Sequence, residues 1–213
     1  MTEHNSQDPK PTPLDALHRE MGAKMVAFAG YAMPVHYEAG IINEHLHTRE
    51  KASIFDVSHM GQAHLSGDGA AAAFEALVPG DIQGLGMGKT RYTVLTNDRG
   101  GIIDDLMVTN GGERLFLIVN AAGKEVDFAH IRDRLAGKAV LEPLEDRALV
   151  ALQGPAAAAV LGRFLPAARH MMFMTAEALV IGDIPCFVTR SGYTGEDGYE
   201  ISVAAGDAET LVR

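Results

Sequence analysis

The sequence predicts an α+β fold in which mixed or antiparallel sheets are flanked by helices. Three short apolar runs, at 91–96, 102–108 and 115–119, are separated by turns rich in Asn, Asp and Gly, which is the pattern of an antiparallel meander. Other segments carry apolar residues at helical spacing. With 213 residues, 47% of them hydrophobic, the chain can bury one large core or two smaller ones.

The first part of the chain is expected to begin with a disordered leader over residues 1–11, which are polar and contain prolines. A helix is expected after Thr12, because this cap residue is followed by Pro13 and by apolar residues at helical spacing. Glycines, aromatics and prolines over 24–37 predict a strand, a turn at Gly30 and an irregular loop. The next expected elements are a helix over 41–51, strands over 53–60 and 61–65, and a short helix over 67–77.

After a glycine-studded loop over 79–89 and the meander, the chain alternates helices and strands. Two lobes are expected: residues 55–143, which include the meander, form one, and residues 12–54 together with 144–213 form a discontinuous other. The remaining expected elements are helices over 123–135, over 155–165 and from Gly206, and strands over 148–152, 178–181, 186–190 and 199–203.

Composition and charge exclude several classes of function. The formal charge of −10 argues against a nucleic-acid binder, because such proteins show a basic face. Cys186 is the only cysteine, so the chain alone forms no intramolecular disulfide and no multi-cysteine metal site, and a reducing compartment fits. No apolar run reaches transmembrane length. We therefore expect a soluble cytoplasmic protein that binds neither nucleic acid nor membrane.

Two adjacent acids, Asp104 and Asp105, lie inside the apolar run 102–108. Successive strand residues point to opposite faces, so the two side chains are expected on different sides of a strand that is covered on both. Burying an ionised carboxylate is costly unless it is paired or hydrogen-bonded. One interpretation is a pocket carboxylate with a shifted pKa; the other is that both acids cap a strand end or bind backbone amides.

Three other motifs do not support a phosphate or metal site. The loop 80–90 ends in Gly-Lys-Thr, but Gln83 stands where a P-loop needs glycine, and the loop runs toward a strand rather than a helix. His45 and His47 diverge by about 200° around a helix and lack the spacing of zinc ligands. His59 has no second and third ligand nearby in the sequence, so we interpret it as a structural histidine. No metal is predicted.

Residues 192–200, Gly-Tyr-Thr-Gly-Glu-Asp-Gly-Tyr-Glu, describe a constrained turn that presents an aromatic ring and a carboxylate. A hairpin turn explains the Glu-Asp-Gly part of this segment. It does not explain Glu200, an acid placed early in an apolar strand. A carboxylate so placed can accept two parallel N–H bonds from a planar amidine-like group, which pterins, guanines and arginine all offer.

Four segments, in order along the chain, resemble the aminomethyltransferase (T-protein) family of the glycine cleavage system. They are 28–34 (Phe-Ala-Gly-Tyr-Ala-Met-Pro), 55–61 (Phe-Asp-Val-Ser-His-Met-Gly), 100–106 and 192–200. Together they are specific for the superfamily of tetrahydrofolate-binding proteins, and the first two favour the T-protein. Family members are substantially longer, so the chain resembles their N-terminal part.

The resemblance implies transfer of an aminomethyl group from the lipoyl arm of a partner, the lipoylated H-protein, to tetrahydrofolate. The products would be 5,10-methylenetetrahydrofolate, ammonia and dihydrolipoyl H-protein. The resemblance also implies that Asp105 is the catalytic aspartate and Asp104 its structural neighbour. It places six residues around the folate, with Glu200 on the pterin edge: Met60, Tyr92, Asn120, Phe173, Tyr193 and Glu200.

The chemistry implied by the resemblance suits a buried carboxylate at Asp105. Loss of ammonia from the aminomethyl thioether passes through a cationic, iminium-like state, which an aimed carboxylate stabilises better than water does. Asp105 could also orient or deprotonate the folate amine. The electrostatic role and the proton-transfer role both stay open at this point.

The sequence departs from the family pattern in two places. Thr109 stands where some relatives have a tyrosine near the folate, and the family's downstream arginines, which face the folate's glutamate tail, have no counterpart before Arg213. We therefore expect this length of chain to bind folate weakly and to turn over poorly. The alternative functions are a folate-binding domain of the dimethylglycine or sarcosine dehydrogenase type and a non-catalytic folate-binding protein.

Overall fold

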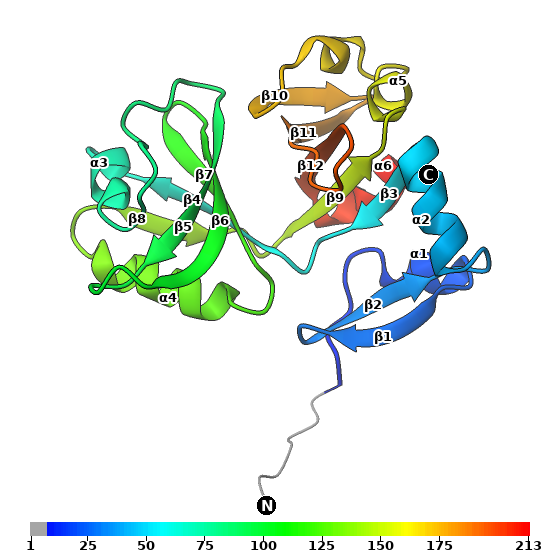
Figure 1. Cartoon of the computed structure of the whole chain (residues 1–213), viewed down its shortest axis with the longest axis horizontal. Helices are drawn as coiled ribbons and strands as arrows, with labels where there is room; N and C mark the ends of the chain where they lie inside the picture. The colour runs from blue at the N-terminus through cyan, green and yellow to red at the C-terminus, as the bar shows by residue number, and fades with distance from the viewer. Residues whose placement is uncertain (1–7) are drawn as a thin grey trace, which may run out of the picture.

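The computed structural model describes residues 8–213, so most of the expected leader lies outside the described residues (Figure 1). The helices are α1 (Asp15–Glu20), α2 (Ile41–Glu50), α3 (Ala70–Glu75), α4 (Lys124–Arg134), α5 (Ala157–Leu161) and α6 (Ala208–Val212), with 3-10 turns η1 (Pro166–His170) and η2 (Ala205–Asp207). No helix within residues 8–213 is both long and apolar enough to cross a membrane.

Within residues 8–213, the strands form two five-stranded sheets and a separate hairpin, and every ladder between these strands is antiparallel. The hairpin consists of β1 (Lys24–Phe28) and β2 (Tyr31–His36). The first sheet has the order β10 (Thr175–Ile181), β11 (Ile184–Arg190), β12 (Gly198–Ala204), β9 (Arg147–Gln153), β3 (Ser53–Asp56). The second has the order β5 (Thr90–Thr96), β6 (Ile102–Asn110), β7 (Arg114–Val119), β4 (Gly61–Ser66), β8 (Val140–Pro143). The α+β prediction is thus confirmed, with antiparallel rather than mixed sheets.

The expected meander is present as β5, β6 and β7, and local turn chemistry explains its register. In the β5–β6 turn the Asn97 side-chain oxygen accepts the backbone N–H groups of Arg99 and Gly101, while Gly100 has a φ of +74° that suits glycine. This turn places Asp105 opposite Val94 on the neighbouring strand.

Each sheet has its own hydrophobic core, and a third, smaller cluster joins them. The third cluster is built on Phe116 and Ile118 from β7 and Leu149 from β9. Phe187 of β11 packs against it, with its ring edge-on to Phe116 at 5.0 Å between centroids. The two sheets therefore pack against each other through apolar side chains, which Figure 1 shows as two neighbouring lobes.

The structure corrects the expected boundary between the lobes. Strand β3 pairs with β9 in the first sheet, so residues 53–56 belong with the flanking segments rather than with a lobe that begins at residue 55. The second sheet and its helices occupy 61–143. The chain passes between the sheets at 57–60 and again at 144–146, and a bridge between Lys89 and Thr175 adds a third link.

Residues 31–36, expected as an irregular loop, form a strand instead. Ala29 and Gly30 both have positive φ, at 48° and 82°, and so make a tight two-residue turn that returns the chain along β1. Pro34 is tolerated because the hairpin has only two strands. Lys10 forms a parallel bridge with Tyr31, so this residue of the expected leader is paired in the structure.

Two further differences concern short strands. The strand expected over 53–60 ends at Asp56, because the chain turns after this residue. The Ser58 backbone N–H donates to the Asp56 carboxylate, and the Met60 backbone N–H donates to the Val57 backbone oxygen. Strand β8 was not expected, since its four residues are too few to show an alternating pattern. It forms through pairing with β4, which is distant in sequence.

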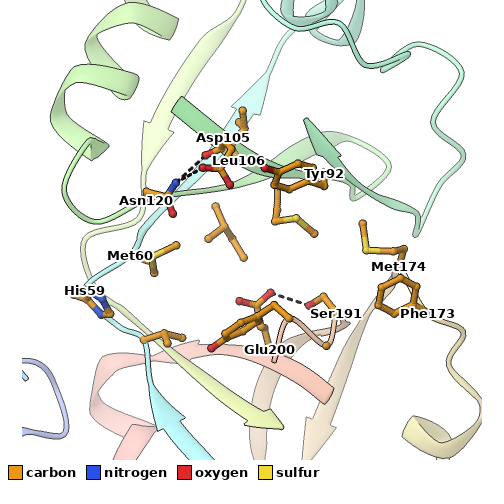
Figure 2. A pocket seen from close by; sticks show the side chains of 15 residues that line it. His59, Met60, Tyr92, Asp105, Leu106, Asn120, Phe173, Met174, Ser191 and Glu200 are labelled. Atoms are coloured by element: carbon orange, nitrogen blue, oxygen red, sulfur yellow. Dashed lines mark hydrogen bonds between the residues drawn. The ribbon is translucent and has the colours of Figure 1, made fainter. Parts of the chain in front are cut away.

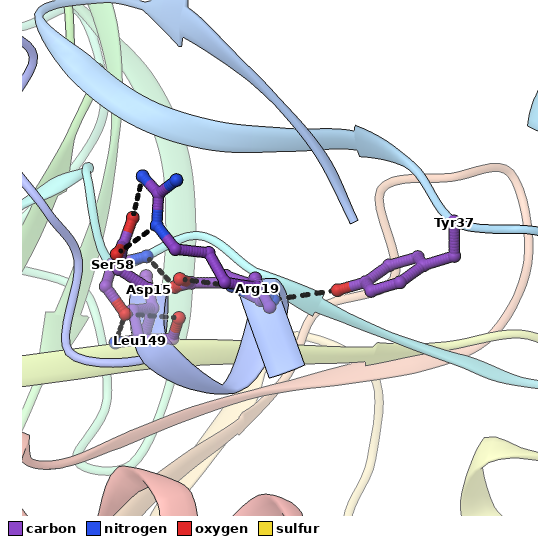
Figure 3. Close-up of polar contacts among 7 residues, drawn as sticks. Asp15, Arg19, Tyr37, Ser58 and Leu149 are labelled. Atoms are coloured by element: carbon purple, nitrogen blue, oxygen red, sulfur yellow. Dashed lines mark hydrogen bonds and ion pairs between the residues drawn. The ribbon is translucent and has the colours of Figure 1, made fainter. Parts of the chain in front are cut away.

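A buried polar network anchors α1 to the end of β3 (Figure 3). His18 Nε2 lies 3.0 Å from Asp56 Oδ2, and His18 Nδ1 lies 2.7 Å from the Tyr37 hydroxyl. Burial raises the pKa of Asp56, but the bonds from His18 and Ser58 outweigh it and hold that pKa below its usual range. The Ser58 hydroxyl also contacts the backbone of Leu149. This network fixes the segment 57–60, which leads into the site.

Candidate active site

A cavity of about 580 Å³ lies between the two sheets (Figure 2), a size within the usual range for small-molecule sites. Its walls come from β5, β6 and β7 on one side, and from β12 and the loops beside β10 and β11 on the other. All seven site residues named from the sequence line it: Met60, Tyr92, Asp105, Asn120, Phe173, Tyr193 and Glu200.

The Asn120 amide joins the two adjacent acids. Its Nδ2 donates to Asp105 Oδ1 at 2.8 Å and to Asp104 Oδ1 at 2.9 Å. Because ionised carboxylates only accept hydrogen bonds, the amide nitrogen must face them, as Figure 2 shows for Asp105. Asp105 lines the cavity, whereas Asp104 does not and instead accepts the backbone N–H of Asp105 at 2.9 Å.

The strand that carries these acids differs from the expectation. Only its second half is covered on both sides: the successive residues Val108 and Thr109, which point to opposite faces, are both buried, whereas Ile102 is 68% exposed. Strand β7 ends opposite Leu106, so the two acids lie past the end of that ladder. The side chains of adjacent strand residues normally point to opposite faces. Here both carboxylates nevertheless reach Asn120, which directly follows β7.

Tyr92 forms the edge of the cavity next to Asp105. It lies on β5 opposite Met107, and its ring is directed toward the Asp105 carboxylate in Figure 2. A side-chain hydrogen bond to Asp105, followed by the charge of that carboxylate, raises the pKa of Tyr92. The phenol therefore keeps its proton and can donate to the carboxylate.

Glu200 lies across the cavity on β12, between Thr189 of β11 and Ala151 of β9. It is 8% exposed, and the Ser191 hydroxyl donates to Glu200 Oε2 at 2.7 Å. Burial raises the pKa of Glu200, while the bond from Ser191 opposes that shift. Figure 2 shows the carboxylate directed into the cavity, where it can accept further N–H donors.

Aromatic side chains from two loops flank Glu200. Tyr193 is held by its backbone N–H, which donates to Gln153 Oε1 at 3.1 Å. Its ring faces the cavity, and removal from water, followed by the charge of Glu200, raises the pKa of Tyr193. Phe173 is 64% exposed and precedes Met174, whose φ of 59° is unusual for a side chain of that size.

The turn between β11 and β12 is stiffened by a two-pronged ion pair. Arg190 donates from Nε to Asp197 Oδ1 at 2.9 Å and from its second terminal nitrogen to Asp197 Oδ2 at 2.6 Å. Arg190 also donates to the Met171 backbone oxygen at 2.6 Å. Glu196, the other acid of this turn, pairs with Arg49 on α2. These contacts fix the segment that carries Tyr193.

Sequence reasoning missed several residues at this site. His59, interpreted as structural, lines the cavity, and burial lowers the pKa of its imidazole. Ser191 was not identified, although a serine directly after an expected strand and before Gly192 was a weak signal. Asp127 on α4 was not identified either; its signal is an acid four residues before the apolar Ile131, on the face that the helix buries.

Comparison with known proteins identifies the family. The profile of the GCVT N-terminal domain matches residues 14–213. The chain belongs to the GCVT N-terminal domain family. Within residues 8–213, no group of three or more His, Cys, Asp or Glu side chains is placed to hold a metal ion.

Similar curated proteins are aminomethyltransferases. Mitochondrial aminomethyltransferase of Dictyostelium discoideum is 44% identical over 97% of this chain and 54% of its own length. The mitochondrial aminomethyltransferase of Gallus gallus is 47% identical over 95% of this chain and 54% of its own length. The aminomethyltransferase of Deinococcus deserti is 41% identical over 95% of this chain and 57% of its own length. The chain therefore spans about half the length of the curated relatives it matches.

Solved structures agree with this family. The glycine cleavage system aminomethyltransferase T from Bartonella henselae superposes with a TM-score of 0.89 and 42% identity, over 95% of this chain and 56% of that one. Heterotetrameric sarcosine oxidase from Corynebacterium sp. U-96 superposes with a TM-score of 0.61 at 21% identity, over 94% and 90%. The second likeness concerns the fold alone.

Proposed function

We propose that this GCVT N-terminal domain carries the folate pocket and the catalytic carboxylate of an aminomethyltransferase of glycine cleavage. The reaction would move a one-carbon unit from the aminomethyl-lipoyl arm of the H-protein to tetrahydrofolate, with release of ammonia. One observation carries the proposal: Asp105 and Glu200 face the same cavity from opposite sheets (Figure 2).

The two carboxylates are suited to different tasks. Glu200, held by Ser191, would accept two parallel N–H bonds from the amidine edge of the pterin. Asp105 would face the reacting amine, where its negative charge stabilises a developing cation. Asn120 keeps Asp105 in place by a hydrogen bond to its carboxylate, and the Tyr92 ring is directed toward that carboxylate (Figure 2).

Partners and compartment belong to the same proposal. The lipoyl group would be supplied by the H-protein, and tetrahydrofolate would enter the cavity as the acceptor. The cytoplasmic placement stays a prediction, because the similar proteins include ones named mitochondrial as well as bacterial ones. No observation favours the alternative of a dimethylglycine or sarcosine dehydrogenase type, since the likeness to sarcosine oxidase, at 21% identity, concerns the fold alone.

Asp105→Asn tests the catalytic role, because this substitution keeps the shape and removes the charge. Ammonia release from aminomethylated H-protein is expected to fall by about 100-fold, while tetrahydrofolate affinity by calorimetry changes only a few-fold. Asp133→Asn, at an exposed acid of α4, is the matched control and should leave both unchanged. Turnover of Asp105→Asn within a few-fold of the wild type would refute the assignment.

A further inference from the structure

Asp127 is a buried acid that the proposed reaction does not use. It lies in the first turn of α4, beside the buried Phe128, and is only 1% exposed. Among residues 8–213, neither carboxyl oxygen of Asp127 has a hydrogen-bond donor in reach. A buried carboxylate without donors is strongly disfavoured, so the group is stable there only when it holds a proton and donates it.

The Asp104 carboxylate lies beside Gly123, as Asp127 does, and offers an acceptor for that proton. A Cβ atom placed on Gly123 would lie 2.4 Å from Asp104 Oδ2 and 3.2 Å from Asp127 Oδ2, so both oxygens converge on the same backbone position. Asp104 Oδ1 is already occupied by Asn120 and by the backbone N–H of Asp105. Its Oδ2 is therefore the oxygen left to accept a bond from Asp127, and it lies at the N-terminal end of α4, where helix dipoles favour a negative charge.

We propose that Asp127 is a positioning residue of the cavity: its protonated carboxyl donates to Asp104, which holds the Asn120 amide and, through it, the Asp105 carboxylate. Hydrogen bonds from the Asn120 amide connect Asp104 to Asp105 in the cavity wall. Asn120 Nδ2 bonds Asp104 and Asp105 at nearly equal distances, 2.9 and 2.8 Å, so a shift of Asp104 moves the amide that orients Asp105. The catalytic consequence rests on the function proposed for Asp105.

The charges around Asp127 make this arrangement sensitive to pH. Burial, and then the negative charges of Asp104 and Asp105 on β6, raise the pKa of Asp127 to about 7. On its own helix, Lys124 is directed elsewhere and bonds Tyr31 and the His59 backbone. Loss of the proton above that pH therefore places two carboxylates against each other and removes the bond that holds Asp104.

Nuclear magnetic resonance of the isotope-labelled chain tests the network without any assay of turnover. The Asp127 carboxyl carbon should titrate near pH 7, and the side-chain N–H resonances of Asn120 should shift with the same midpoint. In Asp127→Asn, whose amide donates to Asp104 at every pH, the Asn120 resonances should no longer titrate in that range. Asp133→Asn, at an exposed position of the same helix, should leave the wild-type titration intact.

Activity is the second measurement. Ammonia release by the wild type should decline on the alkaline side with a midpoint near pH 7, and Asp127→Asn should retain activity within a few-fold and lose that decline. If the chain binds no folate at any pH, the proposed function fails, while the resonances still decide the role of Asp127.

Two results would overturn the inference. One is an Asp127 carboxyl that is already ionised at about pH 5, near the ordinary range for aspartate. The other is a titration midpoint of the Asn120 side-chain resonances that differs from the midpoint of the Asp127 carboxyl in the wild type. This comparison does not depend on whether any variant folds.

Discussion

Asp104 and Asp105 are neighbours in the chain, yet their partners give them different tasks. Asp105 lies beside the Tyr92 phenol and lines the cavity. Asp104 instead accepts a backbone N–H and lies beside Gly123, at the start of α4. The Asn120 amide is common to both. Of the two readings that the sequence left open, cavity carboxylate and structural acid, each therefore describes one member of the pair.

Glu200→Gln keeps the size of the side chain and removes the charge that would pair with the pterin edge. We expect tetrahydrofolate affinity to fall by about 10- to 100-fold, the order expected for hydrogen bonds to a charged group. Because the pKa of Glu200 is raised, the wild-type carboxylate gains a proton at a higher pH than an ordinary glutamate. On acidification, the tetrahydrofolate affinity of the wild type should therefore begin to fall before the pH reaches 4.5, the ordinary pKa of a glutamate. The affinity of Glu200→Gln should not change over this range.

Calorimetric titration across this pH range makes the measurement. Glu177→Gln, at an exposed acid on β10, is the control and should behave as the wild type does. Equal affinities of Glu200→Gln and the wild type at neutral pH would contradict the role of Glu200.

Gly154 lies where three elements meet. It directly follows β9, its backbone N–H donates to the backbone oxygen of Asp197 at 2.8 Å, and its φ is 131°. A Cβ atom there would lie 2.4 Å from the backbone oxygen of Lys51 and 2.7 Å from that of Thr48. The junction between β9 and α5 thus packs directly on the connection between α2 and β3, next to the Gln153 side chain that holds Tyr193.

Gly154→Ala should therefore lower the free energy of unfolding by about 2 to 4 kcal/mol, because the left-handed backbone and the contact with backbone atoms both oppose a side chain. Gly206→Ala, where no atom lies within 4 Å, should change it by less than about 0.5 kcal/mol. Urea denaturation followed by circular dichroism compares the two. Equal urea midpoints for the two variants would contradict this prediction, because they would show that the α2–β3 connection can move to accommodate the new side chain without loss of stability.

The cavity exists because two separately built sheets are packed together. Asp105 and Glu200 belong to different sheets, and the cluster of Phe116, Ile118 and Leu149 sets the distance between them. The geometry of the site thus depends on residues that do not line it, such as Phe116, which is buried between the sheets.

Phe116→Ala should lower the free energy of unfolding by about 3 to 5 kcal/mol and weaken tetrahydrofolate binding by about 10-fold, because the sheets lose their packing contact. Leu65→Ala removes a fully buried side chain from the core of the second sheet alone. It should destabilise by a similar amount, about 2 to 5 kcal/mol, yet leave affinity unchanged. Affinity measured well below the unfolding transition separates the two effects, and equal affinity losses in both variants would contradict this view.

Local patterns were sufficient where neighbours in the chain decide the structure. The Asn, Asp and Gly turns predicted the meander. The family resemblance, which four short segments carry, implied seven site residues that the structure brings around one cavity. Their roles in binding and catalysis stay predictions. Pairing between distant segments decided the rest: β3 joins β9, β8 joins β4, and both acids reach Asn120 because β7 ends opposite Leu106. Asp127 entered the site for the same reason, since burial and the nearby charges of Asp104 and Asp105 give it a raised pKa, and those neighbours exist only once the helix packs on the sheet.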